Sequence, residues 1–97
     1  MDYDEFDQRS RELLDRLKGR LSEQRWNEAD NYWGHGEWDL LTETVLESLI
    51  EDRVRISNPE YALISRMVKH FDPDKFVPFT LKPEEYLGRL VVANDEA

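Results

Sequence analysis

The sequence predicts an all-α protein, a compact bundle of four to five helices with a short extended segment near the C-terminus. Apolar residues recur at helical spacing in several stretches, capping residues precede these stretches, and glycine or proline follows them. The length of 97 residues suits one domain spanning residues 1–97, and 39% apolar residues are enough for a modest core. We expect only the tail, residues 94–97, to be frayed.

The first two helices are expected at about residues 3–20 and 22–34. Gly19 is a candidate for the end of the first helix, and Ser22 is typical of an N-cap that begins the second. Two glycines, in Gly34-His35-Gly36, predict a helix end and a sharp turn. The apolar stripe of the first helix consists of Tyr3, Phe6, Leu13, Leu14, Leu17 and Leu21.

A third helix is predicted over about residues 37–52, and the short link at 53–56 could be extended. The core stripe of this helix is Trp38, Leu41, Val45, Leu46 and Leu49. Ser57 and Glu60 then form the pattern of a capping box, in which each side chain accepts a hydrogen bond from the other residue's amide. A fourth helix therefore begins there, and it would bury Tyr61, Ile64, Met67, Val68 and Phe71.

The pattern is less regular towards the C-terminus. Residues 76–79 are rich in phenylalanine and valine but contain a proline, so they predict an extended segment packed on the bundle. A final short helix begins at Pro83 and would bury Tyr86, Leu87 and Leu90. Val91-Val92 could instead be a strand, and both helix and strand stay open for residues 86–92.

The net charge of −9 is concentrated in one part of the chain. Residues 26–52 contain no lysine and no arginine, and all three tryptophans lie there. The remaining 70 residues carry fourteen acidic and thirteen basic groups, so they nearly balance. The eight carboxylates of the acidic segment are Glu28, Asp30, Glu37, Asp39, Glu43, Glu47, Glu51 and Asp52.

Four of these carboxylates are spaced four residues apart on the third helix and form an acidic ridge, Asp39, Glu43, Glu47 and Glu51. Each like-charge pair costs roughly 0.2–0.5 kcal/mol in an isolated helix, a cost that lysines among them would remove. Leu40 and Ile50 project near the ridge, and carboxylates beside apolar groups are typical of protein interfaces. We therefore predict a partner-binding surface made of Trp33, His35, Glu37, Asp39, Glu43, Glu47 and Glu51.

The alternative interpretation is a helix face that is only solvated, or one that pairs inside the fold with arginines of the first or fourth helix. The tryptophans, taken one by one, also favour core packing over partner contact, and Trp38 is expected in the core. Trp33 lies beside the glycine pair and is the best candidate for partial exposure, followed by Tyr32.

Composition disfavours several classes of function. The absence of cysteine removes thiolate nucleophiles and cysteine zinc sites, and two histidines without a fixed carboxylate spacing define no metal site. The serines lie in no nucleophile motif, and no glycine-rich phosphate loop is present. We therefore expect a protein that is not an enzyme and has no catalytic residues, cofactor or metal.

The acidity and the lack of long apolar runs indicate the kind of partner and the compartment. A negative field repels nucleic acid and anionic lipid and speeds encounter with a basic protein. No apolar run approaches the roughly 18–20 residues that span a bilayer, and the acidic N-terminus is unlike the basic start of a signal peptide. The expectation is a cytoplasmic protein with a protein partner, no nucleic acid and no membrane.

The middle of the chain carries a longer pattern. The run Gly36-Glu37-Trp38-Asp39-Leu40 opens an acidic helix with leucines every three to four residues, and a basic or polar link follows. Ile56-Ser57 and a helix holding Glu60-Tyr61 complete the pattern. Over about residues 33–64, a third of the chain, it resembles the MafI-type immunity proteins and is similar to the small immunity proteins of contact-dependent growth inhibition. The acidic start is longer than in that pattern, and the C-terminal end differs from it.

The resemblance implies a helical fold, action in the cytoplasm and a cognate toxin, commonly a nuclease delivered by a neighbouring cell. Our hypothesis is an immunity protein that neutralises the C-terminal domain of such a toxin by covering its active or substrate-binding surface. The protein would be a monomer when free and would bind the toxin 1:1. The rival hypothesis is an acidic adaptor or regulatory domain with no toxin partner.

Overall fold

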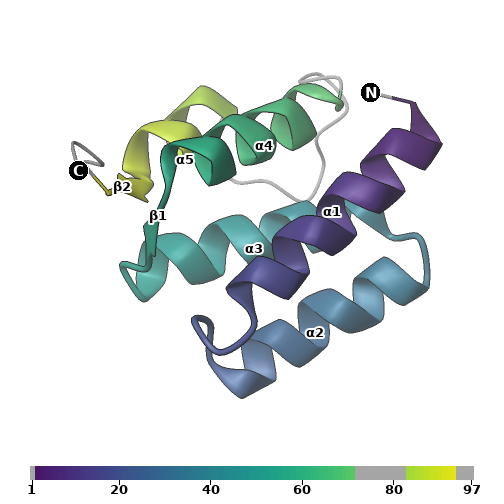
Figure 1. Cartoon of the computed structure of the whole chain (residues 1–97), viewed down its shortest axis with the longest axis horizontal. Coiled ribbons are helices and arrows are strands. Elements are labelled where there is room, and N and C mark those ends of the chain that lie inside the picture. Colours follow the sequence, from purple (N-terminus) through teal and green to yellow (C-terminus); the bar gives the residue numbers. More distant parts are fainter. Residues whose placement is uncertain (1, 72–82, 94–97) are drawn as a thin grey trace.

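The computed structural model of the chain describes residues 2–71 and 83–93. Within these ranges the chain forms five helices and one small sheet (Figure 1), which confirms the predicted helical bundle. The elements in chain order are α1 (Tyr3–Leu17), α2 (Glu23–Gly34), α3 (Trp38–Glu51), β1 (Arg55–Ile56), α4 (Asn58–Lys69), α5 (Pro83–Arg89) and β2 (Val91–Val92). Helix α1 contacts both α2 and α4, while α3 lies along α2 and also reaches α5.

Short polar side chains begin the first two helices. Oδ1 of Asp2 accepts a hydrogen bond from the amide of Glu5 at 2.7 Å. Oγ of Ser22 accepts one from the amide of Arg25 at 3.2 Å, which confirms the predicted N-cap. These bonds satisfy amides that have no partner within the helix, and such caps are typically worth about 1 kcal/mol.

Glycines turn the chain after α1 and α2. The first helix ends at Leu17, a little earlier than predicted, and Gly19 follows with a φ of 85°. Gly36, two residues before α3 begins, has a φ of 68°. Residues with a Cβ adopt this left-handed conformation at a cost, so glycine at these two positions lets α2 fold back on α1 and α3 fold back on α2.

Helix α4 begins with the predicted capping box, and an ion pair between Arg20 and the buried Glu60 reinforces it. Oγ of Ser57 accepts from the amide of Glu60 at 3.2 Å, and Oε1 of Glu60 accepts from the amide of Ser57 at 2.8 Å. Glu60 is only 4% exposed, and Arg20 donates to its two carboxylate oxygens at 2.7 and 3.1 Å. The guanidinium of Arg20 also donates to the carbonyl oxygen of Arg55. The turn after α1 is thereby joined to β1 and to the start of α4.

The same contacts determine how Glu60 responds to pH. Burial raises the pKa of Glu60, but the hydrogen bonds from Arg20 and Ser57 outweigh burial and leave the pKa below its ordinary value. The folded state therefore holds this carboxylate ionised more firmly than the unfolded chain does. Its contribution to stability is present above the ordinary glutamate pKa and is lost as the pH falls through the lowered, folded-state pKa.

The two short strands form a parallel pair that the sequence pattern did not reveal. Arg55 pairs with Val91 and Ile56 with Val92, and the amide of Ala93 donates to the carbonyl oxygen of Ile56 at 2.7 Å. Parallel strands require a long crossover connection, and here the intervening chain includes α4 and α5. The question left open for residues 86–92 is thus resolved: helix α5 ends at Arg89 and a strand follows.

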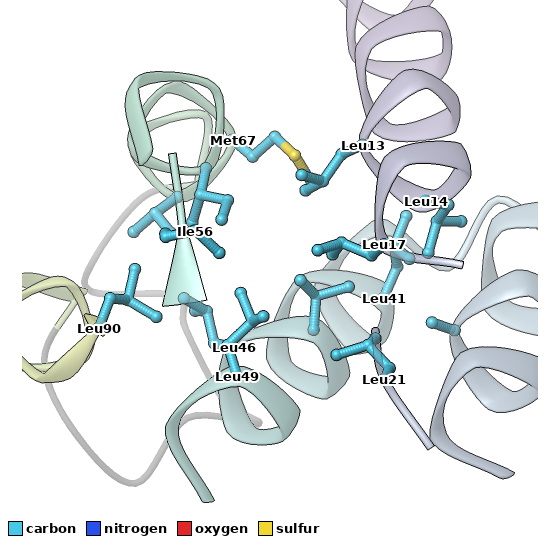
Figure 2. Packing of buried hydrophobic residues seen from close by; sticks show 14 of the residues in the cluster. Leu13, Leu14, Leu17, Leu21, Leu41, Leu46, Leu49, Ile56, Met67 and Leu90 are labelled. Atoms are coloured by element: carbon cyan, nitrogen blue, oxygen red, sulfur yellow. The ribbon is translucent and has the colours of Figure 1, made fainter. Parts of the chain in front are cut away.

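One hydrophobic core joins the helices and β1 (Figure 2). Met67 of α4 and Leu13 of α1 meet at the top of this view, while Leu46 and Leu49 of α3 meet Ile56 and Leu90 below. The buried apolar residues are Phe6, Leu13, Leu14, Leu17, Leu21, Ala29, Leu41, Val45, Leu46, Leu49, Ile56, Ile64, Met67, Val68, Tyr86 and Leu90.

The predicted core is therefore largely confirmed, with one error and several partial cases. Tyr3 was expected in the apolar stripe of the first helix, but it is 72% exposed. It is the first residue of α1 and so lies at the end of the apolar stripe, and its ring forms a T-shaped pair with that of His70, with 6.0 Å between the ring centroids. The residues that are half-buried against the core include Trp38, Tyr61, Phe71 and Leu87.

Two predicted features, the extended segment at 76–79 and the frayed tail at 94–97, lie outside the described residues. Among the helices of the described ranges, none is long and apolar enough to cross a membrane.

Candidate partner-binding surface

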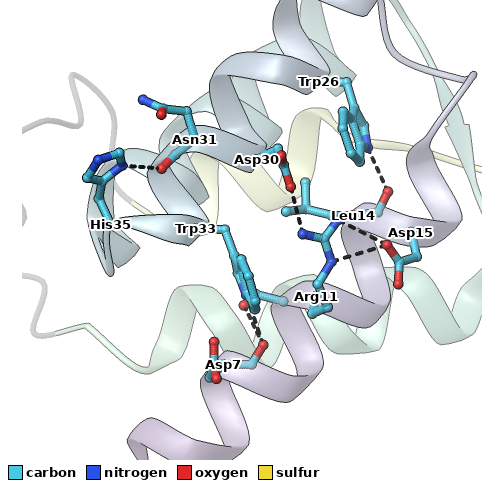
Figure 3. A network of polar contacts seen from close by, with 10 residues as sticks. Asp7, Arg11, Leu14, Asp15, Trp26, Asp30, Asn31, Trp33 and His35 are labelled. Atoms are coloured by element: carbon cyan, nitrogen blue, oxygen red, sulfur yellow. Dashed lines mark hydrogen bonds and ion pairs between the residues drawn. The ribbon is translucent and has the colours of Figure 1, made fainter.

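Two of the three tryptophans are held against α1. Nε1 of Trp26 donates to the carbonyl oxygen of Leu14 at 2.7 Å, and Nε1 of Trp33 donates to the carbonyl oxygen of Asp7 at 3.1 Å (Figure 3). Both side chains are half-buried and pack against the core. The indole N–H of Trp33, predicted as part of the partner-binding surface, is thus already used inside the fold.

Arg11 fills the space between these two indoles. Its guanidinium carbon lies 5.7 Å from the ring centroid of Trp26 and 4.8 Å from that of Trp33. The same guanidinium contacts Asp15 at 2.9 Å and Asp30 at 2.6 Å (Figure 3). No sequence signal marks this cluster, because Arg11 and Asp30 are 19 residues apart and meet only when α1 packs on α2. It pairs Asp30, one of the eight carboxylates of the acidic segment, inside the fold.

The turn between α2 and α3 leaves the next two predicted residues accessible. His35 is exposed, with Nδ1 lying 2.8 Å from the carbonyl oxygen of Asn31. Glu37 is exposed at the N-cap position of α3 but forms no capping hydrogen bond with its side chain. Both side chains therefore stand at the N-terminal end of the acidic ridge, as the spacing predicts.

The acidic ridge follows the side of α3 that faces away from the core. Asp39 and Glu51 are exposed, and Glu43 and Glu47 are half-buried. The buried residues of α3 lie on its other side and are Leu41, Thr42, Val45, Leu46, Ser48 and Leu49. Leu40, near the ridge, is also half-buried. The face thus combines closely spaced carboxylates with a partly accessible apolar side chain.

Most of the negative charge on this face is not neutralised by an ion pair with the described residues. Glu51 is bound by Arg25 of α2. Within the part of the chain that the structure describes, Glu37, Asp39, Glu43 and Glu47 form no ion pair. The arginines of α1, of the turn after it and of α4 pair elsewhere: Arg9 and Arg16 with Glu12, Arg11 with Asp15 and Asp30, Arg20 with Glu60, and Arg66 with Glu5.

Glu43 is a ridge carboxylate whose ionisation is disfavoured by its surroundings. Its Oε2 is buried and accepts no hydrogen bond from residues 2–71 or 83–93. Burial raises the pKa of Glu43, and the charges of Glu47 and Asp39 raise it further. Because the folded-state pKa is raised, ionised Glu43 opposes folding, and stability is lost as the pH rises through that pKa. A cation placed beside the ridge would relieve this cost.

Glu43→Gln is therefore expected to stabilise the protein at neutral pH. The variant removes two like-charge contacts at four-residue spacing, so the free energy of unfolding should rise by about 0.5–1 kcal/mol. The gain should shrink as the pH falls through the raised pKa, because wild-type Glu43 then binds a proton and loses its charge. Urea denaturation at neutral and at acidic pH measures both effects.

Glu28→Gln is the matched control for that experiment. Glu28 is exposed on α2, and the residues four positions away from it, Gln24 and Tyr32, are uncharged. The control should change stability little and equally at both pH values. If both variants change the free energy of unfolding by the same amount at both pH values, then burial and the neighbouring charges do not disfavour ionised Glu43.

The described residues also allow a check for a metal site. In the ranges 2–71 and 83–93, no group of three or more histidine, aspartate or glutamate side chains is arranged to hold a metal ion.

Comparison with known proteins finds no matching family model, no matching curated protein and no matching solved structure. The resemblance to immunity proteins therefore stays a prediction from the sequence.

Proposed function

We propose that this protein is a cytoplasmic immunity protein, which binds and neutralises a cognate bacterial toxin domain and catalyses no reaction. The observation that carries the proposal is the outer side of α3. There Glu37, Asp39, Glu43 and Glu47 stand together without an ion pair to any described residue. Such a surface attracts a basic protein and repels nucleic acid.

The free-energy cost of closely spaced carboxylates favours a ridge that binds a partner over a ridge that is only solvated. Like charges four residues apart each cost roughly 0.2–0.5 kcal/mol, and Glu43 adds a buried oxygen without a hydrogen bond from the described residues. Lysine or arginine side chains of a partner would supply charge-assisted hydrogen bonds to these carboxylates. Leu40, half-buried beside them, offers apolar contact within the same surface.

The chemistry of the surface also points to the kind of toxin. A nuclease binds phosphates through lysines and arginines, so its substrate groove is basic. A helix with closely spaced carboxylates fits such a groove and would exclude RNA or DNA from it. We propose a 1:1 complex in which the acidic ridge, with His35 and Glu37 at its N-terminal end, covers the basic groove of the toxin.

The proposal is tested by co-expressing the chain with the toxin C-terminal domain that is encoded directly upstream. The toxin domain alone should stop growth, and the chain should restore survival. The purified complex should weaken as the salt concentration rises, because screening reduces attraction between exposed charges.

Each alternative result has a defined meaning. Rescue by a complex that is insensitive to salt would support the immunity function. It would also show that the acidic ridge is not the main contact with the toxin. An upstream domain that is not toxic, or toxicity without rescue and without a complex, would exclude immunity. The acidic adaptor or regulatory domain would then be the better hypothesis, and a metabolic or regulatory gene upstream would support it.

A further inference from the structure

A basic groove lies between α1 and α4, although the chain as a whole has a net charge of −9. The groove has a volume of about 330 Å³. Three apolar residues of α4, Pro59, Ala62 and Leu63, line the groove and are here called its floor. Three arginines also line it, Arg9 and Arg16 of α1 and Arg66 of α4.

Two glutamates also line the groove, and they cancel only part of its positive charge. Glu60 is already bound by Arg20, which approaches it at 2.7 Å. Glu12 is shared by two arginines, with Arg9 at 3.1 Å and Arg16 at 3.8 Å. The second distance is too long for a hydrogen bond. One carboxylate therefore serves two guanidinium groups.

The arginines of the groove keep unused donors. With the described residues, Arg9 donates one hydrogen bond to Glu12 and Arg66 donates one to Glu5 at 2.9 Å. Each guanidinium has five N–H donors in a planar fork that matches a carboxylate. Arg9, Arg16 and Ala62 are exposed, so these donors and part of the floor are accessible from solvent.

We propose that this groove is a second docking site, which binds a segment of a partner protein that carries carboxylates around an apolar side chain. The guanidinium groups would bind the carboxylates in bidentate fashion, and the apolar floor would receive the apolar side chain. Arg9 and Arg16 are seven residues apart, about 10 Å along the axis of α1. Carboxylates seven residues apart on a bound helix would therefore reach both.

The groove is chemically opposite to the acidic ridge, so the two surfaces select different ligands. The ridge of α3 is expected to bind lysine and arginine, whereas the groove of α1 and α4 binds aspartate and glutamate. The second site does not depend on the proposed immunity function, because it rests on Arg9, Arg16 and Arg66 and on none of the ridge residues. Loss of one surface should leave the other unchanged.

A defined peptide tests the groove in the full chain. The probe is a labelled, end-blocked, helix-forming peptide with two glutamates seven residues apart and a leucine between them. Fluorescence anisotropy should show binding that weakens with salt, and a matched peptide with lysines in place of the glutamates should not bind. The variant Arg9→Ala with Arg16→Ala should weaken binding by at least about tenfold, because two charge-assisted contacts are lost.

Two further variants separate the groove from general electrostatic attraction. Arg53→Ala with Arg55→Ala removes the same charge from two exposed arginines outside the groove, and it should leave peptide binding unchanged. Ala62→Glu places a negative charge on the exposed floor and should abolish binding. Circular dichroism of each variant confirms that the helices are retained.

Several results would overturn the proposal. Failure of the glutamate peptide to bind is one such result, and equal binding of the lysine peptide is another. Equal loss in the groove variant and the Arg53 and Arg55 variant would show attraction without a site. Sedimentation that reveals self-association, abolished by Arg9→Ala with Arg16→Ala, would make a second copy of the chain the occupant instead of a partner protein.

Discussion

Reversing two charges of the acidic ridge, with Asp39→Lys and Glu47→Lys, is expected to slow association with the toxin domain by about 10- to 100-fold. Both carboxylates lie on the outer side of α3 and have no ion pair within the described residues, so the variant removes no internal contact of that kind. The fold should be retained, and Glu43 would gain cations four residues away on each side. Stopped-flow mixing with the toxin domain measures the rate.

The dependence on salt supplies a second readout. Association of the wild-type chain should slow steeply as ionic strength rises, whereas association of the lysine variant should respond weakly or in the opposite sense. Glu84→Lys with Glu85→Lys is the matched control, because it changes the net charge equally at two exposed residues of α5. A control that slows association as much as the ridge variant does would indicate overall charge and not a local surface.

Phe6→Ala is expected to have the largest effect on stability, a loss of about 3–5 kcal/mol. Phe6 is fully buried, and its ring centroid lies 5.2 Å from that of Trp38, 4.9 Å from that of His70 and 5.7 Å from that of Phe71. The side chain therefore connects α1 to the start of α3 and to the end of α4. A domain of this size has about 5–15 kcal/mol in total, so much of the stability would be lost.

Urea denaturation monitored by tryptophan fluorescence measures this effect, and Tyr3→Ala is the control. Tyr3 is on the same helix, three residues earlier, but is 72% exposed, so its truncation should cost less than about 0.5 kcal/mol. Equal costs for the two variants would mean that the N-terminal half of α1 is not packed on the core. The acidic ridge would then rest on a less rigid support.

The predicted helices and their ends agree closely with the structure because each depends on nearby residues. Ser22 and Ser57 cap amides three residues away, and Gly19 and Gly36 turn the chain where a Cβ would be strained. Helical periodicity placed the leucines of α1 and α3 correctly in the core. Tyr3 shows the limit of this reasoning, because periodicity does not indicate where along a helix the core ends.

The acidic ridge could also be predicted from the sequence, since four-residue spacing places carboxylates on one side of any helix. What the sequence left open was whether arginines neutralise it. Only Glu51 of the ridge is paired within the described residues, and its partner is Arg25 of α2 and not an arginine of the first or fourth helix. Spacing alone also gave no indication that Trp33 would use its indole N–H on α1.

The sequence by itself determined the helices, their caps, most of the core and the concentration of charge on α3, because all of these follow from residues a few positions apart. Tertiary structure decided the pairing of β1 with β2, the contact of Arg20 with the buried Glu60 across 40 residues, and the raised pKa of Glu43. It also brought Arg9, Arg16 and Arg66 around one groove. These features depend on which helices pack together, and the free energy that selects the packing is spread over the whole core.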